Sequence, residues 1–476
     1  MPLQAAYIAI VIVYQIVVIL AIIHVVMDNR QPVKTLAWAL VIYFVPLVGL
    51  GFYLIFGVNT RKERLISKRS LDQLSRRAML NFVEQRELSV PAEHKQTVDF
   101  FARQNEAMPF KDNDVEIITS GYAFISRLLR DIAKAQSHIH LNMFIFDDDP
   151  LGRLVADALK DKAAQGVEVK LIYDDVGCWH VSNSFFESLR EAGIEATPFL
   201  PVRFPQFTSK VNYRNHRKIV VIDGTIGYIG GMNIARRYVQ GNSNGAWRDT
   251  MVRIVGGAVY ALQRAFLVDW FFVDRTLVSN RKYYPPLPPT LSNNCLSQVV
   301  TSGPVSPYPE IMQGYVRVIL SARQSIYLQT PYFLPTEPVL LAMKTAALGG
   351  IDVRLMVPHK GDSRFVEWAS RAYLREVMEA DVKVYLYSAG FLHSKTLVVD
   401  DTLCSTGSTN IDFRSFENNF EANIFFYHQP TAMRFKQMFL DDQSHCILLN
   451  DIDAYRHPKF IVRLGESLAR LLAPLL

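Results

Sequence analysis

One pattern of chemically active residues, His-x-Lys-x4-Asp-x6-Gly-[Gly/Ser]-x-Asn, occurs twice in the sequence. A histidine can act as a nucleophile or exchange a proton near neutral pH, and a lysine supplies a positive charge. Five fixed residues at fixed spacing arise by chance on the order of once in ten thousand chains of this length. The first copy contains His216, Lys218, Asp223, Gly230, Gly231 and Asn233, and the second contains His393, Lys395, Asp400, Gly407, Ser408 and Asn410.

The spacing predicts how each copy is displayed. Alternate side chains of a β-strand share a face, so the histidine and lysine of one copy project together while the apolar run behind them packs into the body. Each copy alone provides half of a site. If the copies pack about a pseudo-two-fold axis, both histidines and both lysines converge. The residues expected to add hydrogen bonds to a ligand there are Asn233, Asn410 and Ser408.

Such a site suits the phosphate of a phosphodiester, because two ammonium groups and two amides would surround one tetrahedral oxyanion. A neutral imidazole can attack phosphorus to form a phosphohistidine, while the imidazolium of the other copy protonates the departing oxygen. The lysine beside each histidine would repel a divalent cation, so we expect neither a metal nor a cofactor. His138, His140 and the run 147–149 are of metal-binding types, but the second copy lacks matching residues and we expect structural roles for them.

Each histidine needs a carboxylate that fixes its tautomer through the second ring nitrogen. The candidates are Asp249, 33 residues after His216, and Glu421, 28 residues after His393, and both open an apolar stretch. Asp223 and Asp400 close the apolar strand of their copies. For these two aspartates a structural role at a turn and a direct role in the chemistry both remain open.

The two copies belong to a larger internal repeat. Residues 135–141 correspond to 322–328, and residues 166–172 to 350–356, at nearly constant offsets. Each copy has the order helix, strand, helix, strand, which is a βαβ pattern and predicts a largely parallel sheet covered by helices. The predicted fold is therefore α/β, with two similar domains at 111–283 and 310–476, a proline-rich linker at 284–309 and a basic linker region at 61–110.

The first 60 residues predict two membrane spans. No Asp, Glu, Lys or Arg occurs from Leu3 to Met27 or from Thr35 to Thr60, and either stretch can cross about 30 Å of hydrocarbon as a helix. A cleaved signal peptide fits less well, because no basic segment precedes the first stretch and no small-residue cleavage site follows it. We expect a helical hairpin.

The charge pattern supports a membrane location. Of the net charge of +6, residues 61–77 carry +5, which leaves a neutral body behind one basic collar. This disfavours a nucleic-acid binder, and it favours contact with anionic lipid and a body on the cytoplasmic side. The four cysteines form no CxxC pair and indicate a reducing compartment, and nothing in the sequence fixes an oligomeric state.

The duplicated pattern resembles that of the phospholipase D superfamily. The segments 35–40, 43–50, 215–219 and 416–421, together with the hairpin, are similar to bacterial cardiolipin synthases of the long, two-span type. The resemblance implies that one phosphatidylglycerol donates its phosphatidyl group to a histidine with release of glycerol, and that a second phosphatidylglycerol accepts it to give cardiolipin. It implies a multi-pass protein of the bacterial inner membrane. It further implies active-site roles for His216 as nucleophile, His393 as acid and then base, and Lys218, Asp223, Lys395 and Asp400.

Two rival functions follow from the same residues. A membrane-bound hydrolase of phospholipids would use the same covalent intermediate with water as the acceptor. A non-catalytic membrane scaffold would be expected to have lost one of the two patterns, and both are complete. Two segments are left open: 241–245 is a surface loop or a lid, and the apolar positions of 461–475 predict a helix that docks on the body or contacts lipid.

Overall fold

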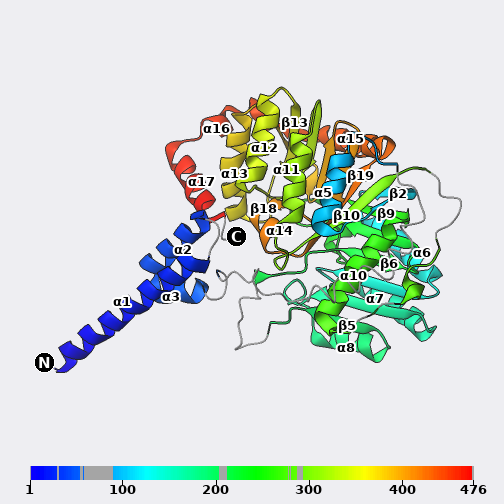
Figure 1. The fold of residues 1–476 in the computed structure, drawn as a ribbon, viewed down its shortest axis with the longest axis horizontal. Helices are drawn as coiled ribbons and strands as arrows, with labels where there is room; N and C mark the ends of the chain where they lie inside the picture. The colour runs from blue at the N-terminus through cyan, green and yellow to red at the C-terminus, as the bar shows by residue number, and fades with distance from the viewer. Residues whose placement is uncertain are drawn as a thin grey trace.

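The computed structural model describes residues 2–28, 32–53, 57, 89–202, 212–276, 278, 280–286 and 293–473. It consists of two α/β repeats and a helical segment at the N-terminus, which projects from one end of the body (Figure 1). The predicted fold class, with two similar α/β repeats, is confirmed. The basic collar 61–77 lies outside the described residues.

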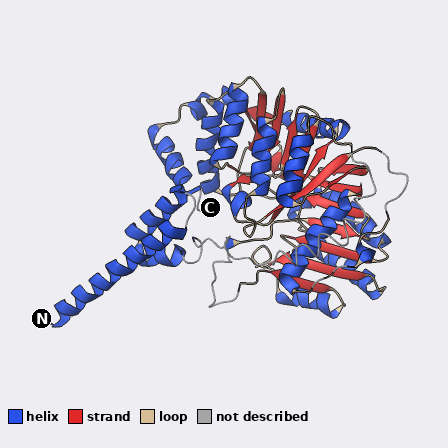
Figure 2. Ribbon diagram, viewed as in Figure 1, coloured by secondary structure: helices blue, strands red, loops and turns tan. Residues whose placement is uncertain are grey.

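The first repeat is built on a seven-stranded sheet in the order β2-β9-β7-β6-β3-β4-β5. Helices cover its faces (Figure 2). Apolar β-branched residues dominate its central strands, as in Ile219–Ile222, and every residue of that strand is buried. The strands are β2 (Asn113–Ile118), β3 (His138–Met143), β4 (Glu168–Asp174), β5 (Glu195–Phe199), β6 (Ile219–Ile222), β7 (Ile226–Gly230), β8 (Ala246–Arg248) and β9 (Met251–Gly256). The helices are α6 (Gly121–Lys134), α7 (Pro150–Ala164), α8 (Asn183–Glu191), α9 (Arg237–Gln240) and α10 (Ala258–Asp274).

The second repeat has a nine-stranded sheet in the order β1-β10-β19-β17-β16-β11-β13-β14-β20, and its seven inner strands follow the plan of the first sheet. The strands are β1 (Pro109–Phe110), β10 (Leu296–Ser302), β11 (Ser325–Gln329), β12 (Phe333–Leu334), β13 (Asp352–Pro358), β14 (Lys383–Tyr387), β15 (Gly390–Leu392), β16 (Thr396–Val399), β17 (Leu403–Gly407), β18 (Ile411–Asp412), β19 (Glu421–Tyr427) and β20 (Cys446–Leu448). The helices are α5 (Lys95–Asn105), α11 (Glu310–Leu320), α12 (Glu337–Leu348), α13 (Arg364–Met378), α14 (Phe413–Glu417), α15 (Gln429–Gln443), α16 (Asp453–Arg456) and α17 (Phe460–Leu472).

The sheets are mixed, so the expectation of a largely parallel sheet is wrong. In the first repeat only β3, β4 and β5 run parallel to one another, and the remaining neighbours pair antiparallel. The reason is that each His-x-Lys pattern begins a hairpin, β6–β7 or β16–β17, and a tight turn can join only antiparallel strands. The strand β10 lies within the segment 284–309 that proline content indicates as a linker, and β1 and α5 pack on the second repeat.

The two repeats share one hydrophobic core. A single buried cluster combines Ile219 and Val252 of the first sheet with Cys404 and Ile424 of the second. The helices α10 and α15 contribute to this cluster, so they lie at the junction between the sheets, while separate clusters fill the outer side of each repeat. The junction is therefore a continuous core, and it fixes the positions of the two histidine-bearing hairpins.

The N-terminal segment contains α1 (Pro2–Asp28), α2 (Pro32–Phe44) and α3 (Pro46–Phe52). The α1 helix includes an apolar stretch, Ala6–Met27, of 22 residues, which is long enough to cross a membrane. The second expected span is divided into α2 and α3 at Pro46, because proline has no backbone N–H with which to continue the hydrogen bonds of α2. Val25 and Ile42 pack together with Tyr53, whose ring lies 5.6 Å from that of Trp38. Among the described residues, α1 alone is long and apolar enough to cross a membrane, and a shorter helical partner broken at Pro46 packs against it.

Candidate active site

The backbone of each histidine is anchored to the opposite repeat. The amide of His216 donates a hydrogen bond to the carbonyl of Phe420 (2.9 Å), and the amide of His393 donates to the carbonyl of Arg248 (2.7 Å). Phe420 directly precedes Glu421, and Arg248 directly precedes Asp249. These two equivalent bonds bring each histidine beside a carboxylate of the other repeat. They are related to each other by the pseudo-two-fold axis of the fold.

The imidazole of His216 is held by Glu421. Its Nδ1 lies 3.0 Å from Oε1 and 3.2 Å from Oε2 of that carboxylate, across a sequence separation of 205 residues. Glu421 also accepts hydrogen bonds from the hydroxyl of Ser408 and from the amide of Asn419 (3.2 Å). We assign the proton of the neutral ring to Nδ1, because a carboxylate can only accept there, and the lone pair is then on Nε2.

The imidazole of His393 is held in the same way by Asp249. Its Nδ1 lies 2.6 Å from Oδ2, and the amide of Thr250 donates to Oδ1 (2.7 Å). The spacing in the sequence associates Asp249 with His216 and Glu421 with His393. The structure exchanges these partners, because each carboxylate opens a strand at the junction, where the facing histidine comes from the other repeat.

The difference between Gly231 and Ser408 follows from the two carboxylates. A Cβ at Gly231 would lie 2.1 Å from Oδ1 of Asp249, which is closer than any real contact. In the second repeat, Ser408 at the equivalent position donates to Glu421. The shorter aspartate is therefore matched with glycine and the longer glutamate with a serine that supports it. The two half-sites are unequal, as the sequence indicates.

Both lysines of the pattern are buried at the same centre. The ammonium of Lys218 donates to the carbonyl of His216 (2.6 Å), and that of Lys395 donates to the carbonyl of His393 and lies 2.9 Å from its Nδ1. Burial and the charge of Lys395 together lower the pKa of Lys218 to about 7, against the opposing effect of Glu421. Burial likewise lowers the pKa of Lys395.

The two histidines are neutral at pH 7 in this arrangement. Burial lowers the pKa of His216 to about 4 against the opposing effect of Glu421, and Lys218 and Lys395 both contribute to the decrease. Burial and the charge of Lys395 lower the pKa of His393 to about 3, and Lys218 adds to this effect. Each imidazole thus senses the lysines of both repeats. The four side chains share one electrostatic environment.

The carboxylates are ionised. Burial alone would raise the pKa of Glu421, but His216, Lys218 and Ser408 reverse the effect and lower that pKa. Burial would also raise the pKa of Asp249, but Lys395 and His393 outweigh this effect and lower that pKa. Below about pH 7, where Lys218 carries its charge, these residues provide two cations, two anions and two neutral imidazoles, and the arrival of a monoanionic phosphodiester would leave an excess of one negative charge.

Three predicted phosphate ligands have other partners. Asn233 accepts a hydrogen bond from the amide of Ile145 (3.0 Å) and donates to the hydroxyl of Tyr238 (2.5 Å). Asn410 hydrogen-bonds the carboxylate of Asp412. Ser408 binds Glu421, as described above. These contacts hold neighbouring loops and the Glu421 carboxylate in place, and direct phosphate binding by Asn233, Asn410 and Ser408 stays a prediction.

The two aspartates of the pattern lie at the far ends of their strands. Asp223 accepts hydrogen bonds from the amides of residues 136, 137 and 138 at 2.7 to 3.0 Å. Asp400 accepts equivalent bonds from residues 323, 324 and 325 at 2.7 to 2.9 Å. Both have positive φ, near 50°. These contacts fix the entry to β3 and β11 and favour the structural role that the sequence left open, while a role in the chemistry stays a prediction.

The other metal-type residues have structural partners. His138 and His140 both bond the side chain of Gln263, at 3.0 and 2.8 Å, and His140 stacks on Phe266. Asp149 caps α7 by accepting from the amides of Leu151 and Gly152 (2.9 Å each). No group of three or more metal-ligating side chains occurs among the residues that the structure describes.

Aromatic side chains enclose the histidines, and the sequence patterns did not indicate them. Trp247 lies 5.1 Å from the ring of His393, which also contacts Phe391, Tyr238 and Tyr332, and Phe144 lies 4.9 Å from the ring of His216. The position of Trp247, two residues before Asp249, was the one feature of the sequence that could have indicated an aromatic side chain beside His393. This enclosure removes the imidazoles from bulk water.

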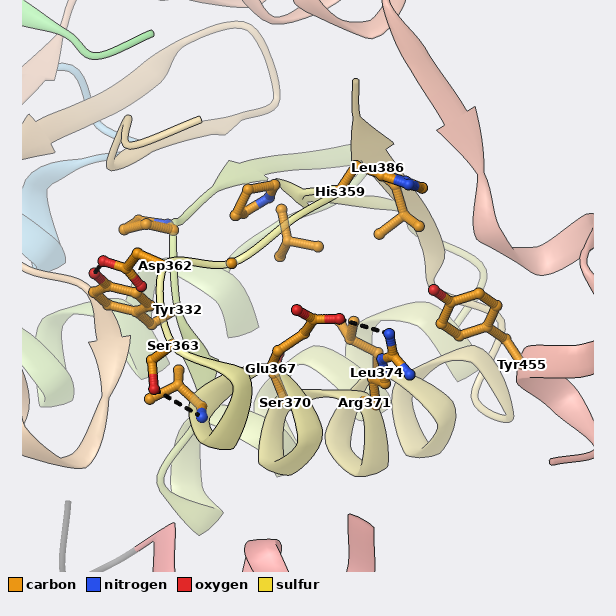
Figure 3. Close-up of a pocket in the computed structure, with 15 residues that line it drawn as sticks. Tyr332, His359, Asp362, Ser363, Glu367, Ser370, Arg371, Leu374, Leu386 and Tyr455 are labelled. Carbon is orange, nitrogen blue, oxygen red and sulfur yellow. Dashed lines mark hydrogen bonds and ion pairs between the residues drawn. The ribbon is translucent and has the colours of Figure 1, made fainter. Parts of the chain in front are cut away.

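A pocket with about 470 Å³ of space not occupied by protein atoms, part of it open to solvent, lies at the ends of β13 and β14, and the ring of Tyr332 in its wall lies 6.5 Å from that of His393. Tyr332 lines this pocket and donates a hydrogen bond to Asp362 (2.6 Å), as Figure 3 shows. On α13, Glu367 pairs with Arg371 at 2.5 Å, and Ser370 faces the same space. Asp362 is close enough to raise the pKa of Lys395. The pocket thus offers several hydroxyl and carboxylate groups next to the cationic centre.

The loop 241–245 spans the two repeats. Its ends are closed by reciprocal backbone hydrogen bonds between Asn242 and Gly245 (2.9 and 3.0 Å). The side-chain amide of Asn244 donates a hydrogen bond to the backbone carbonyl of Gly361 at the pocket rim (3.2 Å). The loop is a short turn that contacts the rim of the pocket.

Comparisons with known proteins agree with this geometry. The chain matches the family described as "Cardiolipin synthase, PLD-like domain" over residues 128–270 and 315–443, and "Phospholipase_D-nuclease N-terminal" over residues 16–57. It is 38% identical to the major cardiolipin synthase ClsA of Bacillus subtilis, over 96% of this chain and 97% of that protein. It is 40% identical to a cardiolipin synthase of Geobacillus kaustophilus, over 94% of this chain and 90% of that protein.

Among solved structures, the fold is similar to that of phosphatidylserine synthase from Haemophilus influenzae. The TM-score is 0.62 at 15% identity, and the match covers 80% of this chain and 100% of that chain. At this identity the likeness concerns the fold alone.

The first prediction concerns the pairing of glycine with aspartate. In Gly231→Ala, the new methyl group displaces the Asp249 carboxylate from His393, so we expect a loss of at least 100-fold in kcat with the melting temperature changed by only a few degrees. The matched control is Ser408→Ala, which removes one of the donors to Glu421 and should cost roughly 10-fold or less. Equal losses in the two variants would contradict this account.

The second prediction separates Asp223 from the chemistry. Asp223→Ala removes three backbone hydrogen bonds and leaves an alanine at positive φ, which should destabilise the body by about 2–4 kcal/mol. The melting temperature in detergent should fall clearly, whereas kcat of the protein that remains folded should change less than about threefold, because no reacting atom is touched. Inactivity at an unchanged melting temperature would show that Asp223 acts in the reaction.

Proposed function

The chain belongs to the cardiolipin synthase family of phospholipase D-like proteins, and from this premise we propose that it joins two phosphatidylglycerol molecules into cardiolipin and glycerol. The observation that carries the proposal is the pair of crossed hydrogen bonds, His216 to Glu421 and His393 to Asp249, which assemble one site from both repeats. This arrangement presents two oriented imidazoles to a single phosphate between two lysines.

In the first half-reaction, Nε2 of His216 attacks the phosphorus of a phosphatidylglycerol. A nitrogen–phosphorus bond forms, the bond from phosphorus to the glycerol oxygen breaks, and His393 gives its proton to that oxygen. Glu421 stabilises the positive charge that develops on the His216 ring. Lys218 and Lys395 offset the charge on the phosphoryl oxygens.

In the second half-reaction, the free glycerol end of another phosphatidylglycerol is the acceptor. Neutral His393 takes the proton of its hydroxyl, the oxygen forms a bond to phosphorus, and the bond to Nε2 of His216 breaks. Both histidines return to their initial state, and the proton that left His393 in the first step is regained. The number of phosphodiester bonds is unchanged, so the reaction needs no external energy source.

His393 takes up a proton from solvent when the anionic substrate binds. The free site is balanced in charge and His393 is neutral, since its pKa is about 3. A phosphodiester brings one negative charge into a buried volume, which favours protonation of the nearest base. We assign His216 as the nucleophile, because Glu421 contacts its ring with both oxygens and stabilises the positive charge that develops there during attack. His393 is then the remaining imidazole of the site and the acid.

The pocket beside His393 is the place for the glycerol group that leaves or enters. It is lined by Tyr332, Asp362 and Ser370, which bond hydroxyl groups well, and it offers no excess of positive charge for a second phosphate. The phosphate itself would lie between Lys218 and Lys395. Tyr332 lines the pocket and contacts the ring of His393, so a polyol held there would lie on the side of the site where His393 must exchange a proton.

Transfer to a lipid alcohol is favoured over hydrolysis by the aromatic enclosure of the histidines. Trp247, Phe391 and Tyr332 surround His393, which is buried, and the side chain of His216 is only 12% exposed. Exclusion of water prolongs the life of a phosphohistidine until an alcohol arrives. The rival function, hydrolysis of phospholipids, uses the same residues and differs only in the acceptor.

The protein is a bacterial membrane protein, in agreement with its relatives and with the apolar helix Ala6–Met27. We further propose that the chain crosses the inner membrane twice and that the body lies on the cytoplasmic side. The support is the sequence pattern of a second apolar segment and of the basic collar 61–77. The proposed partners are phosphatidylglycerol and other anionic lipids.

The third prediction tests the function directly. Purified full-length protein given phosphatidylglycerol in mixed micelles should release glycerol and form cardiolipin in a ratio near one to one. His216→Ala and His393→Ala should each reduce the product by at least 1,000-fold while the protein stays in the membrane fraction. Phosphatidic acid as the main product would replace the synthase by the hydrolase, and substantial synthesis by either variant would refute the two-histidine mechanism.

The fourth prediction is a pH profile of kcat/KM, which reports the free enzyme. His216 has a pKa of about 4, so it stays unprotonated and nucleophilic well below pH 6.5. Lys218 has a pKa of about 7, so its charge is lost as the pH rises through that value. Because His393 takes up a proton when substrate binds, kcat/KM should already fall as the pH rises above about 4. The decline should steepen above pH 7, where Lys218 loses its charge, and Lys218→Arg should remove only this steeper part. An acidic limb centred at pH 6.5 would contradict the account.

A further inference from the structure

The C-terminal helix α17 has its amphipathic character reversed relative to a helix that packs on a soluble body. Glu466 is 3% exposed, and Ala469 is buried beside it. On the outer side, Phe460 and Ile461 are 78% and 81% exposed, and Leu468 and Leu471 are 55% and 69% exposed. The charged residue faces the protein and the apolar residues face away, which is unfavourable in water.

Ion pairs hold the helix in this orientation. Glu466 pairs with Arg375 of α13, and Arg470 pairs with Glu376 at 2.6 Å and lies over the ring of Tyr373. The docking that the sequence predicts for this helix is therefore present, and it uses polar contacts. The outward direction of the apolar side chains is set by these contacts, because rotation of the helix would break both ion pairs and bury the apolar side instead.

The apolar surface continues onto α13. Trp368, 44% exposed, lies against α17 at Gly465, where a Cβ would come within 3.1 Å of its ring, and Phe365 is 38% exposed one turn earlier. We call the combined surface the apolar ridge. It consists of Phe365 and Trp368 of α13 and Phe460, Ile461, Leu464, Leu468, Leu471 and Leu472 of α17.

Two observations identify what covers the ridge. The membrane-spanning helix α1 and its partners extend from the end of the long axis at which α17 lies (Figure 1). In addition, the exposed basic residues Arg456, Lys459 and Arg463 lie at the start of the helix, where they suit an anionic lipid surface. An apolar face flanked by basic side chains and adjoining a membrane span fits the interface of a bilayer.

We propose that the apolar ridge is inserted into the interfacial region of the bilayer that α1 crosses, as a second membrane contact of the body. The proposal rests on the membrane location of the chain and not on its chemistry. The helix α13 connects the ridge to the pocket, because it carries part of the ridge on one side and lines the pocket with Glu367, Ser370 and Leu374 on another. The ridge thus sets the pocket beside the lipid headgroups.

A direct test uses full-length protein in nanodiscs that contain phosphatidylglycerol. Spin labels are placed on single cysteines introduced at Ile461 and Leu468, and at Tyr122 of α6 as a control that is 72% exposed in the first repeat. The unlabelled parent gives the background of the four native cysteines. Labels at 461 and 468 should collide more with oxygen than with a water-soluble nickel complex, and the label at 122 should do the opposite.

Two results would overturn the proposal. One is nickel accessibility at 461 and 468 equal to that at 122, which would place the ridge in water. The other is dipolar broadening between labels together with exclusion of both reagents, which would identify a second copy of the chain as the occupant. Neither result depends on enzymatic activity, so failure of this proposal is distinguishable from failure of the proposed function.

A pair of matched variants tests the consequence for catalysis. Leu468→Glu places a charge on the ridge, and Leu154→Glu places one on α7 at a leucine of nearly equal exposure, 52% against 55%. With phosphatidylglycerol in vesicles, Leu468→Glu should lose at least 10-fold in rate and Leu154→Glu less than twofold. With a short-chain substrate in detergent the two should be equal, which shows that Leu468→Glu is folded. Equal rates on vesicles would contradict the role of the ridge.

Discussion

The site depends on two hydrogen bonds that cross between the repeats, from the His216 ring to Glu421 and from the His393 ring to Asp249. Each is reinforced by a backbone bond from the same histidine to the residue before the carboxylate. Because neither repeat contains a histidine with its own carboxylate, neither forms a complete half-site alone. The shared core around Ile219, Val252 and Ile424 keeps the two halves in register, so packing at the junction directly controls the orientation of the imidazoles.

The charges at this centre are balanced only when the site is free. Two lysines face two carboxylates, and burial holds both histidines neutral. This state has one imidazole ready for attack but no acid, and an arriving phosphodiester changes the balance by one charge. The same anion that is to be cleaved therefore promotes protonation of the group that cleaves it. The membrane location adds a second constraint, since the lipid must present its phosphate to a buried centre while its acyl chains stay in the bilayer.

The sequence was sufficient to predict the duplicated pattern, the α/β repeats, the convergence of His216 and His393 with their lysines, and the identity of the two carboxylates. It could not predict which carboxylate serves which histidine, because these contacts span 205 and 144 residues and arise only from packing between repeats. The sequence left a structural and a chemical role open for Asp223 and Asp400, and the backbone amides that both accept at the far strand ends favour the structural one. Periodicity also did not predict that the second apolar segment would break at Pro46. Nor did it predict that the hairpins β6–β7 and β16–β17 would make the sheets mixed.

The central claim is tested most directly by mapping the covalent intermediate. Full-length protein is mixed with phosphatidylglycerol, quenched in alkali to preserve phosphoramidate, and digested for mass spectrometry. The account predicts a phosphatidyl group on His216 alone in the parent protein and no adduct in His216→Ala. A modified residue outside the pair, or no adduct under conditions where cardiolipin forms, would contradict the shared two-histidine site.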